Sequence, residues 1–431
     1  MKGHTAMTST PSQHPAASIF TPAFVSLLLT EILSSLGQVT LTFALPLHLL
    51  NATGSASLYG IVAALALIPS VILTPVGGAI ADRFDKRKAM AALDAASACA
   101  ALSYALFYSA SSMTLITIVT MMLAYGFHAL YSPIVQATVP CLVDPKRTSG
   151  EGLKRATALI TQVNSLTNMI GPVFAGMLLG FAGLKAVVLL SCGACLISSL
   201  WIFCFIHIPQ LSTHSPMSNP FTSFAADFAQ AGKFLLSQRL LLAANIVIAV
   251  ANLVFCALLN VSLPYIVTHL LGLSNQMQGL TEGAISTGGL AGALLLSLKP
   301  KWFTLSHIPH LLGLSSLCLL PTALALFMHA PTITTYAVLT LATAGAMACV
   351  QCISVTILAY EQGSTPPQLV GKVIGATMAL AMAAMPLGQA VYGMLIDHLP
   401  MPAIMLAAAI LMALTTLYAR PFIDTQDCPK S

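Results

Sequence analysis

Long apolar stretches separated by short polar segments run along nearly the whole chain. Each stretch has 18 or more residues and lacks the alternation of apolar and polar positions that is typical of membrane strands. A helix of about 20 apolar residues crosses about 30 Å of hydrocarbon. The pattern therefore predicts an all-α membrane protein with twelve transmembrane helices, near residues 24–50, 58–80, 89–110, 113–137, 156–180, 186–207, 241–264, 278–298, 306–328, 333–358, 373–396 and 401–419.

Polar segments divide the predicted helices into two groups of six. Residues 1–19 predict a disordered cytoplasmic tail, residues 208–239 a cytoplasmic linker with many turn-forming residues, and residues 421–431 a second cytoplasmic tail. The two six-helix halves are then residues 20–207 and 240–420.

The two halves share a short repeat. The order Gln, three residues, Pro, then Leu-Val and Lys occurs at 136–146, where the fourth helix ends, and at 362–372, where the tenth ends. Six helices separate the copies, which is the register expected if the second half duplicates the first in the same orientation. Parallel repeats of this kind build transporters whose substrate site lies at mid-membrane between the halves.

Composition and charge agree with a membrane protein and predict its orientation. The chain is 57% hydrophobic and 7% charged, which leaves too little polar surface for a soluble globule. Sixteen of the 17 Lys and Arg residues fall on the side of both termini, and Lys185 is the exception. The positive-inside rule then places both termini in the cytoplasm and the protein in the cell (cytoplasmic) membrane. The net charge of +5 reflects this topology and indicates no nucleic-acid partner.

The loop between the second and third predicted helices concentrates charge, with six charged residues among the seven from Asp82 to Lys88. Its sequence, GGAIADRFDKRK, resembles the signature loop of the major facilitator superfamily, in which Gly, a small residue and Asp-Arg precede a basic cluster. The sequence departs at Asp85, where the general pattern has Gly, and the DRFD run resembles the branch that contains macrolide-efflux proteins and enterobactin exporters. The resemblance covers essentially the whole chain and implies a transporter with two six-helix halves.

The signature loop also predicts a cytoplasmic gate. Asp82, at the cytoplasmic end of helix two, is expected to contact the start of helix eleven near Lys372, where exposed amides and the helix dipole favour an anion. Asp94 lies only about a turn from the basic loop and is expected to pair with Arg or Lys there. The predicted gate comprises Gly78, Asp82, Arg83, Arg87, Asp94 and Lys372.

Helices five and eleven carry Pro and Gly in mid-span, where Pro frees a carbonyl and Gly allows another backbone to come close. One interpretation is close helix packing, and the other adds a bend on which the halves rock. Helix five resembles the antiporter signature of drug exporters in part, since Ala158 and Thr167 replace its earlier glycines, and Met122 stands at the family's helix-four arginine. This helix-bend motif comprises Gly171, Pro172, Gly176 and Pro386.

Ionisable side chains at membrane depth are costly and are therefore candidates for function. Glu31, about 10 Å into helix one, begins a polar stripe at helical spacing that is expected to face an aqueous cavity and comprises Glu31, Ser34, Ser35, Gln38 and Thr42. Either Glu31 exchanges a proton between the two sides of the membrane, or neighbouring hydroxyls hold it for structure. Glu282, near the outer start of helix eight, is expected to be solvated.

His128, near the middle of helix four, is either a coupling or substrate residue or a hydrogen-bonded packing residue. The amides of Asn164, Asn168, Asn245 and Asn252 either line the same cavity or form hydrogen bonds between helices. The candidates for proton coupling or substrate binding are therefore Glu31, Gln38, His128, Asn164, Asn168 and Asn252.

Several kinds of chemistry find no support in the sequence. It has no Walker loop for ATP and no assignable Ser-His-Asp arrangement, so neither ATP-driven transport nor an enzyme is predicted. The pairs Cys192 with Cys195 and Cys349 with Cys352 have the spacing of a metal motif, but they lie in apolar helices without His or carboxylate alongside and predict packing. No metal site and no cofactor are predicted.

The sequence thus predicts a monomeric secondary transporter that exports an amphipathic drug-like, macrolide-like or siderophore-like molecule in exchange for protons. Its partners are a small-molecule substrate, protons and the lipid bilayer. One alternative is transport of a metabolite in another direction. A second is a ligand-sensing membrane receptor that keeps the fold and moves nothing.

Overall fold

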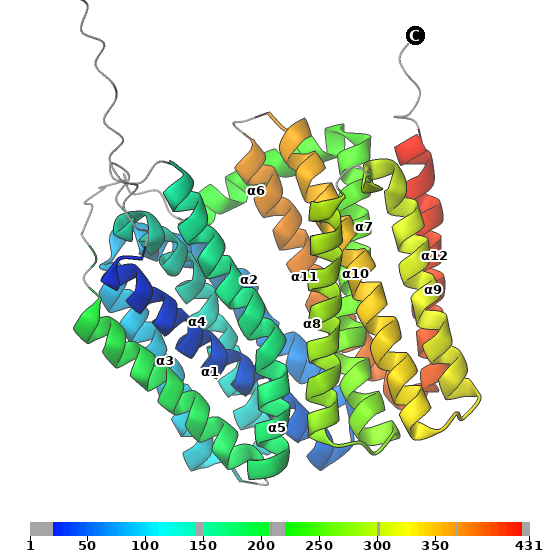
Figure 1. Cartoon of the computed structure of the whole chain (residues 1–431), viewed down its shortest axis with the longest axis horizontal. Helices are drawn as coiled ribbons and strands as arrows, with labels where there is room; N and C mark the ends of the chain where they lie inside the picture. Colours follow the sequence, from blue (N-terminus) through cyan, green and yellow to red (C-terminus); the bar gives the residue numbers. More distant parts are fainter. Residues whose placement is uncertain are drawn as a thin grey trace, which may run out of the picture.

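The structure, a computed structural model, describes residues 20–109, 111–143, 150–206, 208, 220–299, 302–366 and 369–424. Within these ranges helices joined by short turns make up the chain, without a strand (Figure 1). The helices of the first half are α1 (Pro22–Thr53), α2 (Ala56–Arg83), α3 (Lys86–Phe107), α4 (Met113–Leu142) and α5 (Gly150–Phe205). Those of the second half are α7 (Arg239–Ala257), α8 (Asn275–Leu298), α9 (Ile308–Phe327), α10 (Thr332–Ser364), α11 (Val370–His398) and α12 (Met401–Asp424).

Twelve crossings arise from these elements. Helix α5 contains two of them, joined at Gly183, whose φ of 76° is in the left-handed region that favours glycine. Helix α7 continues through two π-helical segments, η1 (Leu258–Ser262) and η2 (Tyr265–Leu270), into one long span. Ten helical segments of the described chain are long and apolar enough to span a membrane, and α8 falls outside that set because glycines and polar residues interrupt it. The predicted all-α fold of twelve helices is confirmed.

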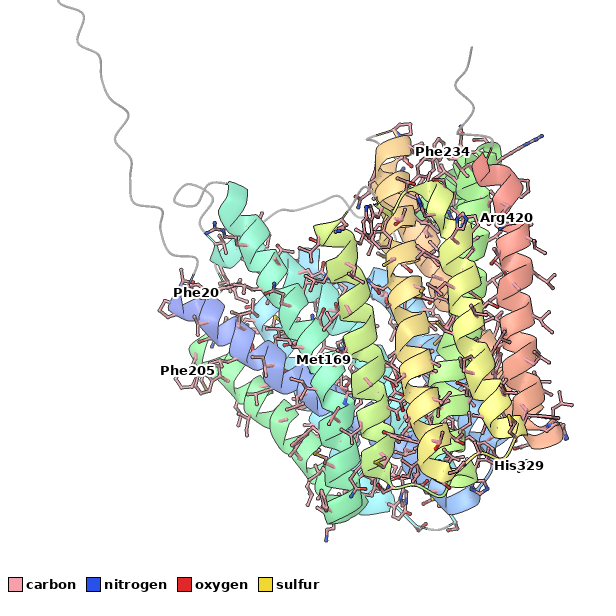
Figure 2. All side chains as sticks on the ribbon, turned by 45° about the vertical axis from the view of Figure 1, so that its right-hand side comes forward. Phe20, Met169, Phe205, Phe234, His329 and Arg420 are labelled. Carbon is pink, nitrogen blue, oxygen red and sulfur yellow. The ribbon has the colours of Figure 1, made fainter. Side chains whose placement is uncertain are left out.

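The ends of the helices define two sides of the molecule. Phe234 and Arg420 lie at one end of the helices and His329 at the other (Figure 2). We call the side where α1 begins and α12 ends the terminal side, and the other the opposite side. Large apolar side chains such as Phe181, Leu341 and Leu106 are exposed around the outside, as expected for surfaces that face lipid.

Side-chain caps set the ends of the first helices. Thr21 accepts a hydrogen bond from the backbone N–H of Phe24 (3.2 Å) at the start of α1. Asp85 accepts one from the N–H of Lys88 (3.2 Å) and so begins α3 one residue after the C-cap of α2. The residue at which the signature loop departs from the family pattern is therefore a helix cap, which explains why an Asp fits there.

The two halves have separate cores and meet along two helix pairs. In the first half α1 and α3 pack on α5, and α2 packs on α4; in the second half α9 packs on α12, and α8 on α10. Across the halves α2 packs on α11 and α5 on α8. The core of the second half extends into the first through Leu50, Ala56 and Tyr59, which lie near the opposite side. The halves are therefore joined most firmly at the opposite side.

Between the halves lies a helix that the sequence analysis did not predict. Helix α6 (Pro220–Ser237) falls within the predicted linker and packs on α11 and α2 at the terminal side. Its buried Ala231 and Leu235 contact Val373 of α11. The linker thus contacts both halves.

Candidate functional site: a polar cavity between the halves

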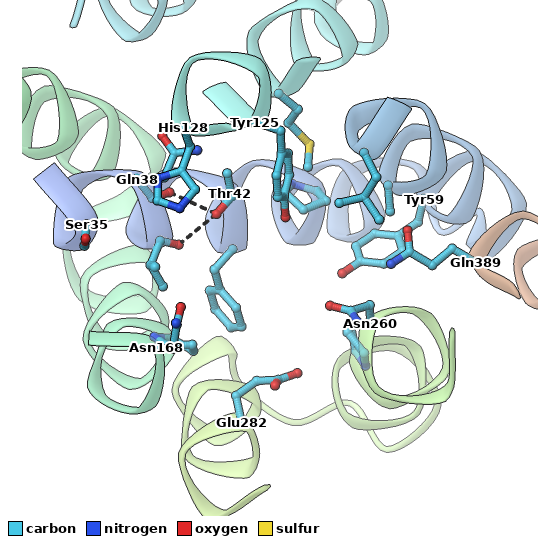
Figure 3. Close-up of a pocket in the computed structure, with 18 of the residues that line it drawn as sticks. Ser35, Gln38, Thr42, Tyr59, Tyr125, His128, Asn168, Asn260, Glu282 and Gln389 are labelled. Carbon is cyan, nitrogen blue, oxygen red and sulfur yellow. Dashed lines mark hydrogen bonds between the residues drawn. The ribbon is translucent and has the colours of Figure 1, made fainter. Parts of the chain in front are cut away.

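A cavity of about 380 Å³ lies between the two halves, near the middle of the helices. Helices α1, α2, α4 and α5 supply its wall in the first half, and η1, α8 and α11 supply the facing wall (Figure 3). Polar side chains from both halves point into it. This volume is large enough for a small organic molecule.

The first half contributes most of the candidates predicted from the sequence. Ser35, Gln38 and Thr42 of α1 line the cavity at helical spacing, and Thr42 donates to the backbone carbonyl of Gln38 (2.9 Å). His128 of α4 is exposed to the cavity on the same wall. Asn164 and Asn168 of α5 complete this wall, and Ser35 donates to Asn164 Oδ1 (3.1 Å).

The second half contributes residues that the sequence analysis did not select. Asn260 lies in the π-helical segment η1, four residues before Pro264. Proline has no N–H, so the carbonyl of Asn260 loses its helical partner, and the local widening turns this residue toward the cavity. Gln389 of α11 lines the same wall.

The position of Glu282 differs from the predicted one. The sequence predicts a solvated residue at the outer start of its helix, whereas the structure places Glu282 at the second turn of α8 with its carboxylate directed into the cavity. Gln278, one turn earlier, donates to its Oε1 atom (3.2 Å). Among the described residues that line the cavity Glu282 is the one carboxylate, and no Lys or Arg accompanies it.

The polar stripe of α1 is divided between the cavity and a buried cluster. Glu31 is 2% exposed and lies beside Asn164 and Ser35, and its Oε2 atom has no hydrogen-bond partner. Ser34 donates to Asp94 Oδ1 (2.7 Å). Ser198, in the second crossing of α5, donates to Asp94 Oδ2 (2.5 Å). The α1 stripe therefore faces the cavity at one end, and at the other end it contains the buried Glu31 and contacts the buried Asp94.

The predicted partner of Asp94 is also wrong. The sequence predicts that it pairs with a basic residue of the signature loop, but its carboxylate is 2% exposed and is held by two hydroxyls. The reason is its position about two turns into α3, where the side chain faces α1 and α5. Asp94 thus bonds to hydroxyls of α1 and α5 rather than to a described basic residue of the loop.

The other gate residues have partners elsewhere. Arg87 donates to the backbone carbonyl of Phe203 and stacks on its ring, 5.3 Å from the centroid. Lys372 donates to Gln230 of α6 (2.6 Å). The structure does not describe the surroundings of Gly78 or the side chains of Asp82 and Arg83, so the predicted contact of Asp82 with α11 stays a prediction.

The two remaining asparagines do not reach the cavity. Asn252 bonds to the carbonyl of Ile248 on its own helix (3.0 Å), and Asn245 bonds to Glu361 of α10 (2.8 Å). For Asn245 the structure matches the alternative of a hydrogen bond between helices. Asn252 is half-buried and is not among the lining residues.

The helix-bend motif coincides with close helix packing. A Cβ added at Gly171 would lie 2.5 Å from Cγ1 of Val39 on α1, and one at Gly176 would lie 2.5 Å from the carbonyl oxygen of Asn275 on α8. Pro172 lines the cavity between these contacts. Pro386, in the middle of α11, lies one turn from Gln389. Whether the motif also serves as a hinge stays a prediction.

Polar contacts close the cavity on the opposite side. Asn51 at the end of α1 donates to Asn275 Oδ1 at the start of α8 (2.7 Å). Asp397, at the end of α11, accepts from the backbone N–H groups of Ala56 and Ser57 (3.3 Å each) at the start of α2. A carboxylate at a helix N-terminus is stabilised by the free amides and the dipole. Asp397 therefore joins the two halves at this end.

We expect Asp397→Asn to weaken this closure. Loss of a charge at a helix N-terminus costs about 1 kcal/mol, which changes the ratio of two conformations about fivefold. Spin labels on the opposite-side ends of α2 and α11 should therefore show a larger population of long distances. Lys185→Gln, which removes an exposed charge from the same side, serves as the control and should leave the distances unchanged. Unchanged distances in both variants would contradict the role of Asp397.

The sequence matches known proteins over most of its length. The model of the Major Facilitator Superfamily matches residues 27–389. Macrolide efflux protein A of Streptococcus pyogenes is 24% identical over 270 residues, which cover 62% of this chain and 64% of that protein. The multidrug efflux pump Tap of Mycobacterium tuberculosis is 24% identical over 405 residues, 92% of either chain. The match thus spans somewhat less than two thirds of the first relative and most of the second.

Solved structures share the fold. The crystal structure of a bacterial homologue of the human lysosomal transporter Spinster, in an inward-facing and unoccupied conformation, has a TM-score of 0.72, covers 95% of this chain and 98% of that one, and is 12% identical. A D-xylose–proton symporter has a TM-score of 0.65 at 16% identity, with 93% and 97% covered. At these identities the likeness concerns the arrangement of the helices.

Proposed function

Because the chain belongs to the major facilitator superfamily, we propose that it exports a small amphipathic molecule in exchange for protons by alternating access. Proteins of this family and fold are transporters and not enzymes. The observation that carries the proposal is the polar cavity between the halves, closed at the opposite side by Asp397 and Asn51. The efflux relatives support the direction of transport.

The orientation in the membrane is part of the proposal. The basic residues assign the terminal side to the cytoplasm and place the protein in the cell membrane with both termini inside. The described conformation, closed at the opposite side, is then the one that takes up cargo from the cytoplasm. An exporter loads in this state and releases in the other.

The lining of the cavity favours a cargo with a positive charge and an apolar body. Glu282 supplies a negative charge that no described Lys or Arg of the lining neutralises, and Tyr59, Tyr125 and Phe43 supply aromatic surface to the same cavity. A carboxylate and aromatic rings together stabilise an organic cation. Amides of the facing wall can orient neutral polar groups of the same molecule.

The pair α2 and α11 offers a switch between the two states. Asp397 at the end of α11 meets the start of α2 at the opposite side. Asp82, at the other end of α2, is predicted to meet the start of α11 at the terminal side. In this proposal the first contact holds the conformation that faces the cytoplasm, and the second replaces it in the conformation that faces outward.

Purified protein in proteoliposomes tests the proposal. A panel of organic cations, neutral drug-like molecules and metabolites is offered with and without an imposed pH gradient. Gradient-driven accumulation of amphipathic compounds is the expected result. Accumulation of a metabolite alone would favour the transport alternative, and saturable binding without accumulation would favour a ligand-sensing receptor.

For cargo selection we expect Glu282→Gln to impair cations selectively. A charge-assisted contact that is lost from a cavity costs about 1.5 kcal/mol, or roughly tenfold in affinity. Competition binding should therefore show a tenfold weaker affinity for cations and little change for neutral compounds of similar size. Glu282→Asp keeps the charge and should retain most of the cation affinity. Equal losses for cations and neutral compounds would show that Glu282 acts through structure.

A further inference from the structure

A second buried polar cluster lies outside the cavity, where α7, α10 and α11 reach the terminal side. Glu361 of α10 is 1% exposed, and its Oε1 atom accepts hydrogen bonds from Asn245 Nδ2 of α7 (2.8 Å) and Thr377 Oγ1 of α11 (2.9 Å). Leu235 of α6 and its neighbours cover this cluster from the terminal side. One carboxyl group thus joins three helices.

Two acceptor atoms of this cluster are left without a donor. Oε2 of Glu361 and Oδ1 of Asn245 are both buried and have no hydrogen-bond partner. The orientation of the Asn245 amide is fixed, because its Nδ2 atom also donates to the backbone carbonyl of Leu241 (2.9 Å), which can only accept. Turning the amide around would lose both of these bonds and would place Oδ1 against two acceptors, the carbonyl of Leu241 and Oε1 of Glu361.

An ionised Glu361 does not satisfy this arrangement. A carboxylate is an acceptor at both oxygens, so Oε2 would stay bare in an apolar setting, and an unpaired buried charge costs several kcal/mol. The hydroxyl of Thr365, one turn further along α10, is also buried without a partner. As a single donor it could serve at most one of the two acceptors.

We propose that Glu361 is a proton-binding site and carries its proton in the described conformation. The proton resides on Oε2 and is donated to Asn245 Oδ1, while Asn245 Nδ2 donates to Oε1. A carboxylic acid and an amide then face each other through two hydrogen bonds, and one proton satisfies both bare acceptors. Release of the proton leaves two acceptors opposed and loosens the junction of α7 with α10.

Charged and titratable groups also lie on the helices around the cluster. Lys372 donates to Gln230 (2.6 Å), and Oε2 of Glu361 has no hydrogen-bond partner. On the helices packed against the cluster these groups are Lys233 of α6, Arg239 of α7, Tyr360 of α10 and Lys372 of α11. Proton binding by Glu361 in the folded protein does not depend on how transport is driven.

Infrared difference spectroscopy of the purified protein against Glu361→Gln tests the proposal, because Gln keeps the shape and supplies an N–H at the position of the proton. The wild-type spectrum should contain one additional carbonyl stretch of a protonated carboxyl, which shifts in deuterium oxide. Asn245→Ala should move this band, since Oε1 loses a donor. Asn252→Ala removes an amide of the same helix with the same bond to its own backbone and should leave the band in place.

A second measurement covers the case in which a variant folds poorly. If the folded protein holds a proton that the solvated Glu361 of the unfolded chain has released, unfolding releases it, and stability falls as the pH rises. From mildly acidic to mildly alkaline pH the melting temperature of the wild type should fall a few degrees more than that of Glu361→Gln. Three results would overturn the proposal. Glu361→Gln could remove bands of an ionised carboxylate instead of the protonated band, or the band could stay in place in Asn245→Ala. The melting temperatures of the wild type and Glu361→Gln could also change equally with pH.

Discussion

Gly60→Ala should reduce transport at least tenfold and open the opposite side of the molecule. A Cβ at this position would lie 2.5 Å from the carbonyl oxygen of Gln389 and 2.9 Å from Cα of Gly393, both on α11. These are backbone atoms, so the contact is relieved only if α2 and α11 move apart. Overpacking of this kind costs about 1 to 3 kcal/mol, which is enough to depopulate the closed conformation.

The expected effect is specific to the contact between the halves. Alanine is a better helix former than glycine, so α2 itself gains from the change. Gly393→Ala should act in the same direction, because its Cβ would lie 2.9 Å from the carbonyl oxygen of Ala56. Gly375→Ala is the matched control on α11, since outside the backbone of its own helix no atom of the described residues lies within 4 Å of the added Cβ.

Two measurements distinguish loss of closure from loss of folding. Spin-label distances across the opposite-side ends of α2 and α11 should lengthen in Gly60→Ala and Gly393→Ala, while the amount of folded protein in detergent stays near that of the wild type. Gly375→Ala should match the wild type in both. Full transport and unchanged distances in Gly60→Ala would rule out the α2–α11 crossing as the closing contact.

The fold could be predicted from the sequence because each crossing needs a long apolar segment, and such segments are visible one by one. Helix α6 was missed because it is amphipathic rather than continuously apolar and directly follows turn-forming residues, and its apolar face packs on α11. Helix α8 was found by length, although its glycines and polar residues make it the least apolar crossing.

The candidate site could be predicted only in part. The α1 stripe and the asparagines of α5 repeat at helical spacing, so one face of one helix could be recognised. Which faces of different helices meet depends on tertiary packing. Glu282 looked solvated because it follows a loop closely, and Asp94 looked like a partner of the basic loop because it is near in sequence. Asn260 had a signal in Pro264, whose effect on the preceding turn widens the helix.

In the proposed mechanism, two carboxylates have separate roles, one in cargo binding and one in proton transfer. Glu282 lies in the cavity wall of the second half, where a cargo can reach it. Glu31 lies behind the wall of the first half, next to Asn164 and Ser35, which themselves line the cavity. In the proposed mechanism a cargo that contacts Asn164 therefore alters the surroundings of Glu31 without touching it. This is the kind of coupling that ties cargo release to proton uptake.

Glu31→Gln should abolish accumulation driven by the pH gradient, with a loss of at least tenfold, because the amide can neither take up nor release a proton. Exchange of cargo down its own gradient should persist, since Gln38, Asn168 and the rest of the cavity are unchanged. Glu31→Asp, which keeps a carboxyl group at this position, is the control and should retain gradient-driven transport. Were Glu31→Gln to accumulate cargo as the wild type does, Glu31 would be a structural residue held by its neighbours.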